Sequence, residues 1–139
     1  MSNEIMTAST TAISTSDMEM EIPDGYICTV DRTTREGTIK VANALSDAAS
    51  LKDKGEAHFT LTDVITTPGV RTRTGEACTN TYLLTADGEI LMTQSDGIKR
   101  SAQQIVGLFG GDFGDGIEVA VISKELNNGN TLKTLHFYA

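Results

Sequence analysis

The side chains that could take part in chemistry in this chain of 139 residues are few, and their spacing does not favour catalysis. His58 and His136 are the only histidines, so general acid–base chemistry near neutral pH has few imidazoles to use. Cys28 and Cys78 occur without a CxxC motif or a histidine at metal-ligand spacing, which favours two reduced, packed thiols. No nucleophile motif such as GxSxG occurs. We therefore expect a protein that is not an enzyme and that needs no metal or other cofactor.

A glycine-rich segment at residues 107–116 has some features of a phosphate-binding loop. It lacks the Lys-Ser/Thr pair of such loops, and it follows a helical pattern where a phosphate loop would precede one. Asp112 and Asp115 stand beside glycines, but the other ligands of a calcium loop are not at the required spacing. The segment is better explained as a flexible connection between a helix and a strand.

Cationic side chains could bind an anionic partner, although the chain as a whole is acidic. The formal net charge is −8, which by itself favours a partner that is not a nucleic acid. Much of the acidity lies in residues 1–24, which contain five carboxylates and no Lys or Arg. Several bases form close pairs that leave room for a local basic groove: Arg32/Arg35, Lys52/Lys54, Arg71/Arg73 and Lys99/Arg100.

The elements that must position these side chains are mostly strands. Thr-rich alternating patterns and turn-forming dipeptides predict five of them, at residues 57–67, 80–86, 89–94, 117–124 and 131–138. Pro68-Gly69 is expected to end the first strand. Asp87-Gly88 and Asn128-Gly129 predict two hairpin turns.

One segment alone has a helical period. Ser95 or Asp96 can cap its N-terminus, and Gly110 is placed to end it. Its apolar residues fall on one stripe: Ile98, Ala102, Ile105, Val106 and Phe109. Because the helix lies between the third and fourth strands, the order predicts a mainly β, OB-type five-stranded barrel. A small β-sandwich with one packed helix is the alternative.

The N-terminal part of the chain is less regular. Residues 26–30 and 38–45 have the character of strands, which either add to the barrel or share its first strand, and 46–55 form a polar loop. Residues 1–22 are acidic and rich in Ser, Thr and Met, which predicts a flexible tail before a single domain at 23–139. No segment resembles a signal peptide or a membrane span, so we expect a cytoplasmic protein.

Several stretches resemble one known family when their order and spacing are considered together. They are "DGYICTVDRTTREGTIKVANALSDAASL", "FTLTDVITTP", "YLLTADGEILMTQSDGIKRSAQQIVGLFG" and "GIEVAVISKELNNGNTLKTLHF". These stretches look like the small single-stranded DNA-binding proteins of phages and conjugative plasmids of Gram-positive bacteria, and the likeness covers roughly residues 23–138. The resemblance implies an OB-type barrel, binding of single strands with little sequence preference, association of subunits along the strand, and no catalytic residues.

Such a function needs cations near the phosphates and flat side chains on which bases can stack. The residues that we expect to contact DNA are Tyr26, Lys40, Phe59, Arg71, Arg73, Tyr82, Lys99, Arg100, Lys124, Lys133, Phe137 and Tyr138. Lys40, Lys124 and Lys133 are expected on strands. Phe137 and Tyr138 are neighbours in a strand and must point to opposite faces, so they cannot both belong to the core.

Three classes of function remain open at this stage. The first is a module that coats single-stranded DNA, or RNA, during phage replication or plasmid transfer. The second is a structural or assembly protein of a phage, and the third is an acidic inhibitor that mimics nucleic acid and binds a host protein. In the first class, the acidic tail at 1–22 either competes with DNA for the basic groove or contacts an adjacent subunit, and we favour the contact between subunits.

Overall fold

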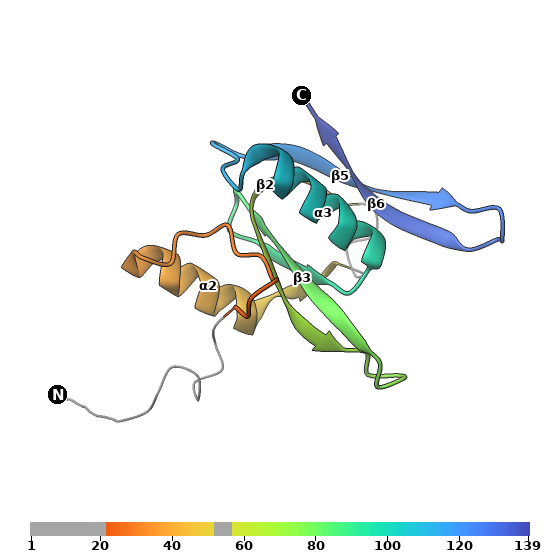
Figure 1. Ribbon diagram of the computed structural model, residues 1–139. Coiled ribbons are helices and arrows are strands. Elements are labelled where there is room, and N and C mark those ends of the chain that lie inside the picture. The colour runs from red at the N-terminus through yellow and green to blue at the C-terminus, as the bar shows by residue number, and fades with distance from the viewer. Residues whose placement is uncertain (1–21, 52–56) are drawn as a thin grey trace.

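A single curled sheet, open along one side like half a barrel, forms the centre of the protein, and one helix covers each of its faces (Figure 1). The computed structural model describes residues 22–51 and 57–139. The strands are β1 (Ala49–Ser50), β2 (His58–Val70), β3 (Ala77–Thr85), β4 (Ile90–Thr93), β5 (Ile117–Glu125) and β6 (Thr131–Tyr138). Their order across the sheet is β1-β4-β3-β2-β5-β6, and every neighbouring pair is antiparallel except β1 with β4. The mainly β, OB-like class expected from the sequence is confirmed at this level.

Helix α3 (Asp96–Phe109) begins and ends at its expected signals. The Ser95 hydroxyl accepts a hydrogen bond from the Ile98 amide, and Gly110 adopts a left-handed conformation that ends the helix. The apolar stripe of α3 faces the concave side of the sheet, where Ile98 and Ala102 are fully buried, except that Phe109 at the end of the helix is exposed.

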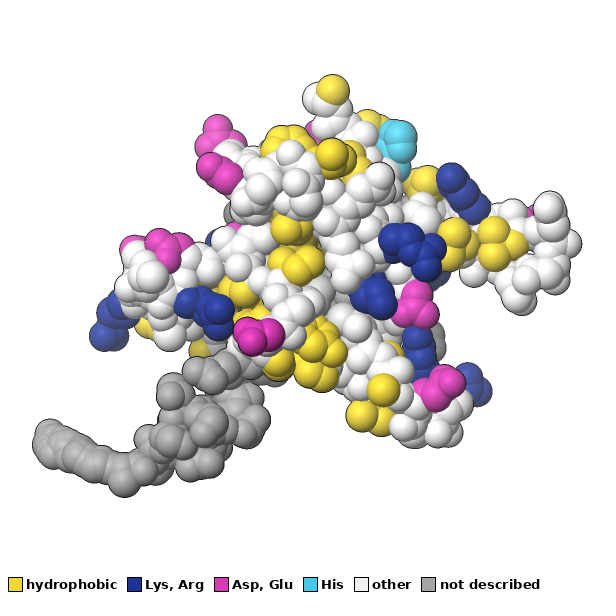
Figure 2. Space-filling view, viewed as in Figure 1, with side chains coloured by type: hydrophobic (Ala, Val, Ile, Leu, Met, Phe, Trp, Pro, Cys, Tyr) yellow, Lys and Arg dark blue, Asp and Glu magenta, His cyan; other side chains and the backbone are white. Residues whose placement is uncertain are grey.

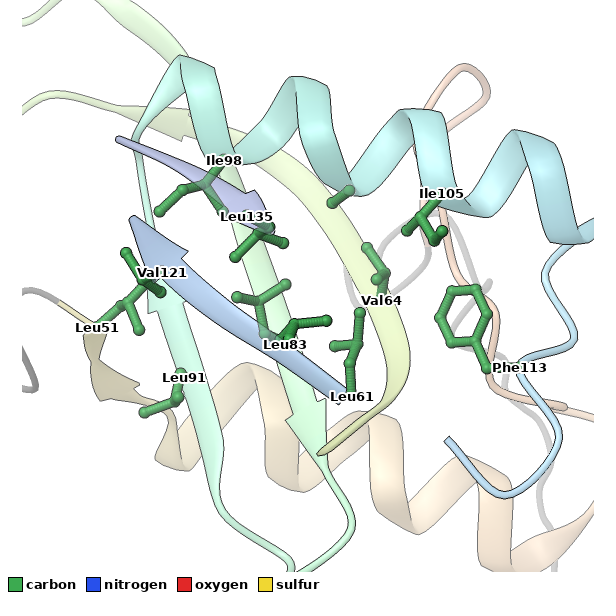
Figure 3. Packing of buried hydrophobic residues seen from close by; sticks show 12 residues of the cluster. Leu51, Leu61, Val64, Leu83, Leu91, Ile98, Ile105, Phe113, Val121 and Leu135 are labelled. Carbon is green, nitrogen blue, oxygen red and sulfur yellow. The ribbon is translucent and has the colours of Figure 1, made fainter. Parts of the chain in front are cut away.

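The larger hydrophobic core lies between α3 and the sheet (Figure 3). It takes side chains from every strand except the two-residue β1, and Leu51 joins it directly after that strand. The buried members are Leu51, Leu61, Val64, Leu83, Leu91, Ile98, Ala102, Ile105, Phe113, Val119, Val121 and Leu135. This core fixes the position of α3 against the sheet.

Residues 38–45 are helical, so the strand predicted there is wrong. They lie within α2 (Arg35–Asp47), which begins at Thr34, whose hydroxyl accepts a hydrogen bond from the Gly37 amide. Val41 and Ala44 are buried against the other face of the sheet, and Leu45 packs beside them. This spacing suits a helix; the alternation at the start of the segment was misleading because a short apolar run fits both periods.

Residues 26–30 extend the sheet without forming a full strand. The Thr29 amide donates to the Val64 carbonyl (3.1 Å), and the Thr66 amide donates to the Ile27 carbonyl (2.8 Å). The segment thus covers the edge of β2 beyond the point where β5 stops pairing with it. The prediction that Pro68-Gly69 ends this strand is wrong, because β2 continues to Val70 with β3 as its partner, and proline is tolerated at such an edge.

Candidate nucleic-acid interface

Two hairpins project from the same side of the sheet, and the N-terminus of α3 lies between them (Figure 1). The β2–β3 turn is closed by a hydrogen bond from the Arg71 amide to the Glu76 carbonyl (2.9 Å). The β5–β6 turn is closed by one from the Leu126 amide to the Asn130 carbonyl (2.8 Å). The two hairpins and the start of α3 therefore frame one side of the molecule.

The base of the β2–β3 hairpin is tied to the start of α3 by charged side chains. Arg71 Nη2 donates to the Gln94 carbonyl (3.4 Å) and lies 3.5 Å from Asp96 Oδ2. Lys99 Nζ lies 3.7 Å from Asp96 Oδ1, so one carboxylate is shared by two cations. A shallow depression is lined by the charged side chains of Arg71, Glu76, Asp96 and Lys99. Each of these four side chains is at least partly exposed. The site therefore combines two cations with two carboxylates and is open to a ligand.

The first turn of α3 is also close to β6. Gly97 packs so tightly that a Cβ atom there would overlap the Lys133 carbonyl oxygen. The Ser101 hydroxyl accepts a hydrogen bond from the Leu135 amide (3.2 Å), which holds the helix on the strand. Lys133 and Lys124 lie one register step apart on paired strands of the β5–β6 hairpin, so Lys133 points to the α3 face of the hairpin and Lys124 to its outer face.

Lys and Arg side chains form a row from the β5–β6 hairpin, past α3, to the β2–β3 hairpin (Figure 2). We call this row the cationic band, and it comprises six of the residues expected from the sequence: Arg71, Arg73, Lys99, Arg100, Lys124 and Lys133. Three separate parts of the chain contribute to it. Because phosphates are neutralised by Lys and Arg, this side of the protein is suited to the backbone of a nucleic acid in spite of the acidic composition.

Lys40 does not belong to the cationic band, and its predicted place on a strand is wrong. It lies on α2, where its Nζ atom forms a 3.0 Å ion pair with Asp63 Oδ2 on β2. The same Asp63 accepts a hydrogen bond from the Thr29 hydroxyl (2.8 Å). Lys40 therefore helps to hold α2 and the N-terminal segment on the outer side of β2.

Tyr82 is buried, contrary to its expected exposure to DNA. Its side chain is 8% exposed and lies in the second hydrophobic core with Ile65, Leu84 and Val41, beneath α2. The burial of this ring depends on α2, the helix over this face that the alternating pattern of residues 38–45 does not indicate. A ring in this position has no free face on which a base could stack.

The remaining expected aromatics lie in three different environments. Phe59 and Phe137 are half-buried against the larger core and are aligned across the sheet through Val119. Tyr138 points to the opposite face and is 45% exposed, as its alternation with Phe137 requires. Tyr26 is half-buried in the N-terminal segment, where its amide donates to the Pro23 carbonyl (3.1 Å).

The comparison with known families shows to which family this chain belongs. The profile of the Phi29-type family, described as phage single-stranded DNA-binding protein, matches residues 20–138, which is most of the chain. The chain belongs to this family. Neither a curated protein nor a solved structure matches the chain. The resemblance to phage proteins that bind single-stranded DNA is therefore confirmed, and single-stranded DNA is the partner that this family binds.

His58 and His136 are two surface rings that were not among the residues expected to contact DNA. The imidazole of His58 stacks on Tyr138 with ring centroids 5.3 Å apart, and His136 meets Tyr138 edge-on at 4.7 Å. His58 Nε2 also lies 3.0 Å from Glu118 Oε2. The spacing of His136 and Tyr138 placed them on one face of a strand, but the pairing that brings in His58 depends on register.

Two further features are absent from residues 22–51 and 57–139 of this family member. No helix in these ranges is long and apolar enough to cross a membrane. Within them, no group of His, Cys, Asp and Glu side chains is arranged to hold a metal ion. The described part of the chain does not include residues 1–21 or 52–56. The expectations for the N-terminal tail and for Lys52 and Lys54 therefore lie outside it.

Proposed function

We propose that this protein binds single-stranded DNA without sequence preference and coats it during phage replication in the host cell. The observation that carries the proposal is the cationic band, in which separate parts of the chain place Lys and Arg along one side. Contacts from such side chains to phosphates position a strand but do not read its bases. The function requires binding alone, so we propose no catalytic step.

We infer further that the sheet is an OB-type barrel in which β2 to β6 are the five barrel strands. The helix α3 then lies between the third and fourth of them, and β1 occupies the free edge of β4. In OB-folds the loops between strands 1 and 2 and between strands 4 and 5 border the oligonucleotide site. These loops correspond here to the β2–β3 and β5–β6 hairpins, which carry Arg71, Arg73 and Lys124 at or near their turns.

The test is fluorescence anisotropy of a labelled oligo-dT of about 60 nucleotides, long enough for several binding sites. Binding is measured at low and moderate salt, with a duplex of equal length as the control. We expect tight binding to the single strand that weakens with salt, because each phosphate contact releases counterions. Equal binding to duplex, or no binding at low salt, would contradict the proposal, and an oligo-rU arm measures the preference for DNA over RNA.

We also propose that the acidic N-terminal segment takes part in contacts between subunits along the strand. The support is its composition, since Ile5, Met6, Ile13, Met18 and Met20 are spaced through an otherwise polar segment. Sedimentation velocity of the full chain and of a variant lacking residues 1–20, each with and without oligo-dT, tests this role. Loss of association in the shortened variant is the expected result. Tighter DNA binding with unchanged association would indicate instead that the tail competes with DNA.

A further inference from the structure

The outer face of the β2–β5–β6 part of the sheet carries a group of exposed rings that packing does not explain. His58, Ala120 and His136 are register partners and form one row across the three strands. Two residues along each strand, and therefore on the same face, a second row consists of Thr60, Glu118 and Tyr138. Alternation in the strands places both rows on one face.

This face is opposite to the one that α3 covers. The neighbouring row of Phe59, Val119 and Phe137 points into the larger core, so the rings of His58, His136 and Tyr138 point outward. Helix α2 packs over Ile65, Tyr82 and Leu84, further along β2 and β3, and does not reach them. The side chain of His58 is 55% exposed and Tyr138 is 45% exposed.

We propose that His58, His136 and Tyr138 form a stacking surface for a nucleobase of the bound single strand, on the outer face to which Lys124 of the cationic band also points. This inference rests on the proposed function and adds a base-contacting site to it. The rings of His58 and Tyr138 are stacked with their planes 27° from parallel, and a further flat ring can extend this stack. Small Ala120 between the two imidazoles leaves the rings accessible from outside.

The charges around the rings favour a base over a phosphate at this position. Glu118 is exposed and lies 3.0 Å from His58, so a carboxylate stands where a phosphate would be repelled. Lys124 points to the same outer face four residues beyond Ala120 on β5, at a distance of about 13 Å for extended backbone. A strand held by Lys124 through a phosphate can therefore place a nearby base on the rings.

Intrinsic tyrosine fluorescence gives a direct readout, because the chain has three tyrosines and no tryptophan. Tyr82 is buried and Tyr26 is half-buried, so Tyr138 is the most exposed of the three. We expect oligo-dT to quench the emission of the wild-type protein and of the control variant Tyr82→Phe, because the buried Tyr82 ring has no face open to a base. We expect the quenching to be lost in Tyr138→Phe, which retains a ring and most of the affinity.

Affinity supplies the second readout. Tyr138→Ala should weaken oligo-dT binding by about 5- to 150-fold, the range that corresponds to the loss of one base–aromatic stack. The dependence of its affinity on salt should stay as in the wild type, since no phosphate contact is removed. Circular dichroism confirms that the variant is folded, and His136→Ala, outside the core, should give a smaller loss of the same kind.

The outcomes separate this inference from the function on which it rests. If the wild-type protein binds oligo-dT, but quenching persists in Tyr138→Phe and Tyr138→Ala binds as tightly as the wild type, the stacking surface is refuted. The proposed function stands in that case. If the wild-type protein does not bind oligo-dT at all, both are refuted.

Discussion

Removing Arg73 and Arg100 together should make oligonucleotide binding much less sensitive to salt. Arg73 lies in the β2–β3 turn and Arg100 on the solvent side of α3; both are exposed, and neither forms an ion pair with the described residues. Lys124 and Lys133 are likewise outside the ion pairs of the described chain, whereas Arg71 and Lys99 share Asp96. Four cations of the band are thus available for phosphates without first breaking a contact.

The expected magnitude follows from counterion release. Each phosphate contact on a single strand contributes about 0.7 to the slope of log affinity against log salt, so four contacts give a slope of about −2.8. Between about 50 and 200 mM salt, the wild-type affinity should fall about 50-fold. With two contacts removed, the slope becomes about −1.4 and the fall only about 7-fold.

A second double variant with the same change in net charge provides the control. Arg32 and Arg35 are exposed at the start of α2, which packs on the opposite face of the sheet from α3. Anisotropy titrations of Arg32→Ala/Arg35→Ala should give the wild-type slope. Equal loss of slope in both double variants would refute the band and show that overall charge governs binding, and no loss in either would show that the band does not contact DNA.

Three further changes test the packing that positions the interface. Gly97→Ala should lower the free energy of unfolding by about 1–3 kcal/mol in urea titrations, because its Cβ overlaps the Lys133 carbonyl; Gly107→Ala in the same helix has free space and should gain about 0.5–1 kcal/mol. Tyr82→Leu should cost about 1–3 kcal/mol of stability but leave oligo-dT affinity unchanged, and weaker binding by the folded variant would contradict the burial of this ring. Desolvation by burial raises the pKa of the Cys28 thiol, so the fraction of Cys28 present as thiolate at pH 8 is low. Alkylation of Cys28, followed by mass spectrometry across pH, should therefore be slower than alkylation of free cysteine. An equal rate would contradict the burial of this thiol.

Local patterns in the sequence were sufficient for α3 and for the hairpins β3–β4 and β5–β6, but not for the β2–β3 hairpin. The caps at Ser95 and Gly110 define α3, and the Asp87-Gly88 and Asn128-Gly129 turns define two hairpins. These signals act within a few residues and do not depend on what packs on them. The opposite orientation of Phe137 and Tyr138 followed in the same way from strand geometry, and the structure confirms it.

The errors arose where distant contacts decide between two local possibilities. Residues 38–45 fit a short strand or a helix, and the apolar face of β2 and β3 favours the helix by burying Val41 and Ala44. That choice in turn buried Tyr82 and placed Lys40 beside Asp63. One misassigned element therefore accounts for two misplaced site residues.

The sequence by itself determined the family, the mainly β class, the helix α3 and the identity of the cations, since all of these depend on residue type and short-range spacing. Only the tertiary structure decided that cations of both hairpins and of α3 lie along one side, and that His58 meets Tyr138 on the outer face. Both results depend on strand register and on how the hairpins and α3 pack together. A shift of one residue in register would turn every side chain of a strand to its other face, and no local pattern fixes which strands become neighbours.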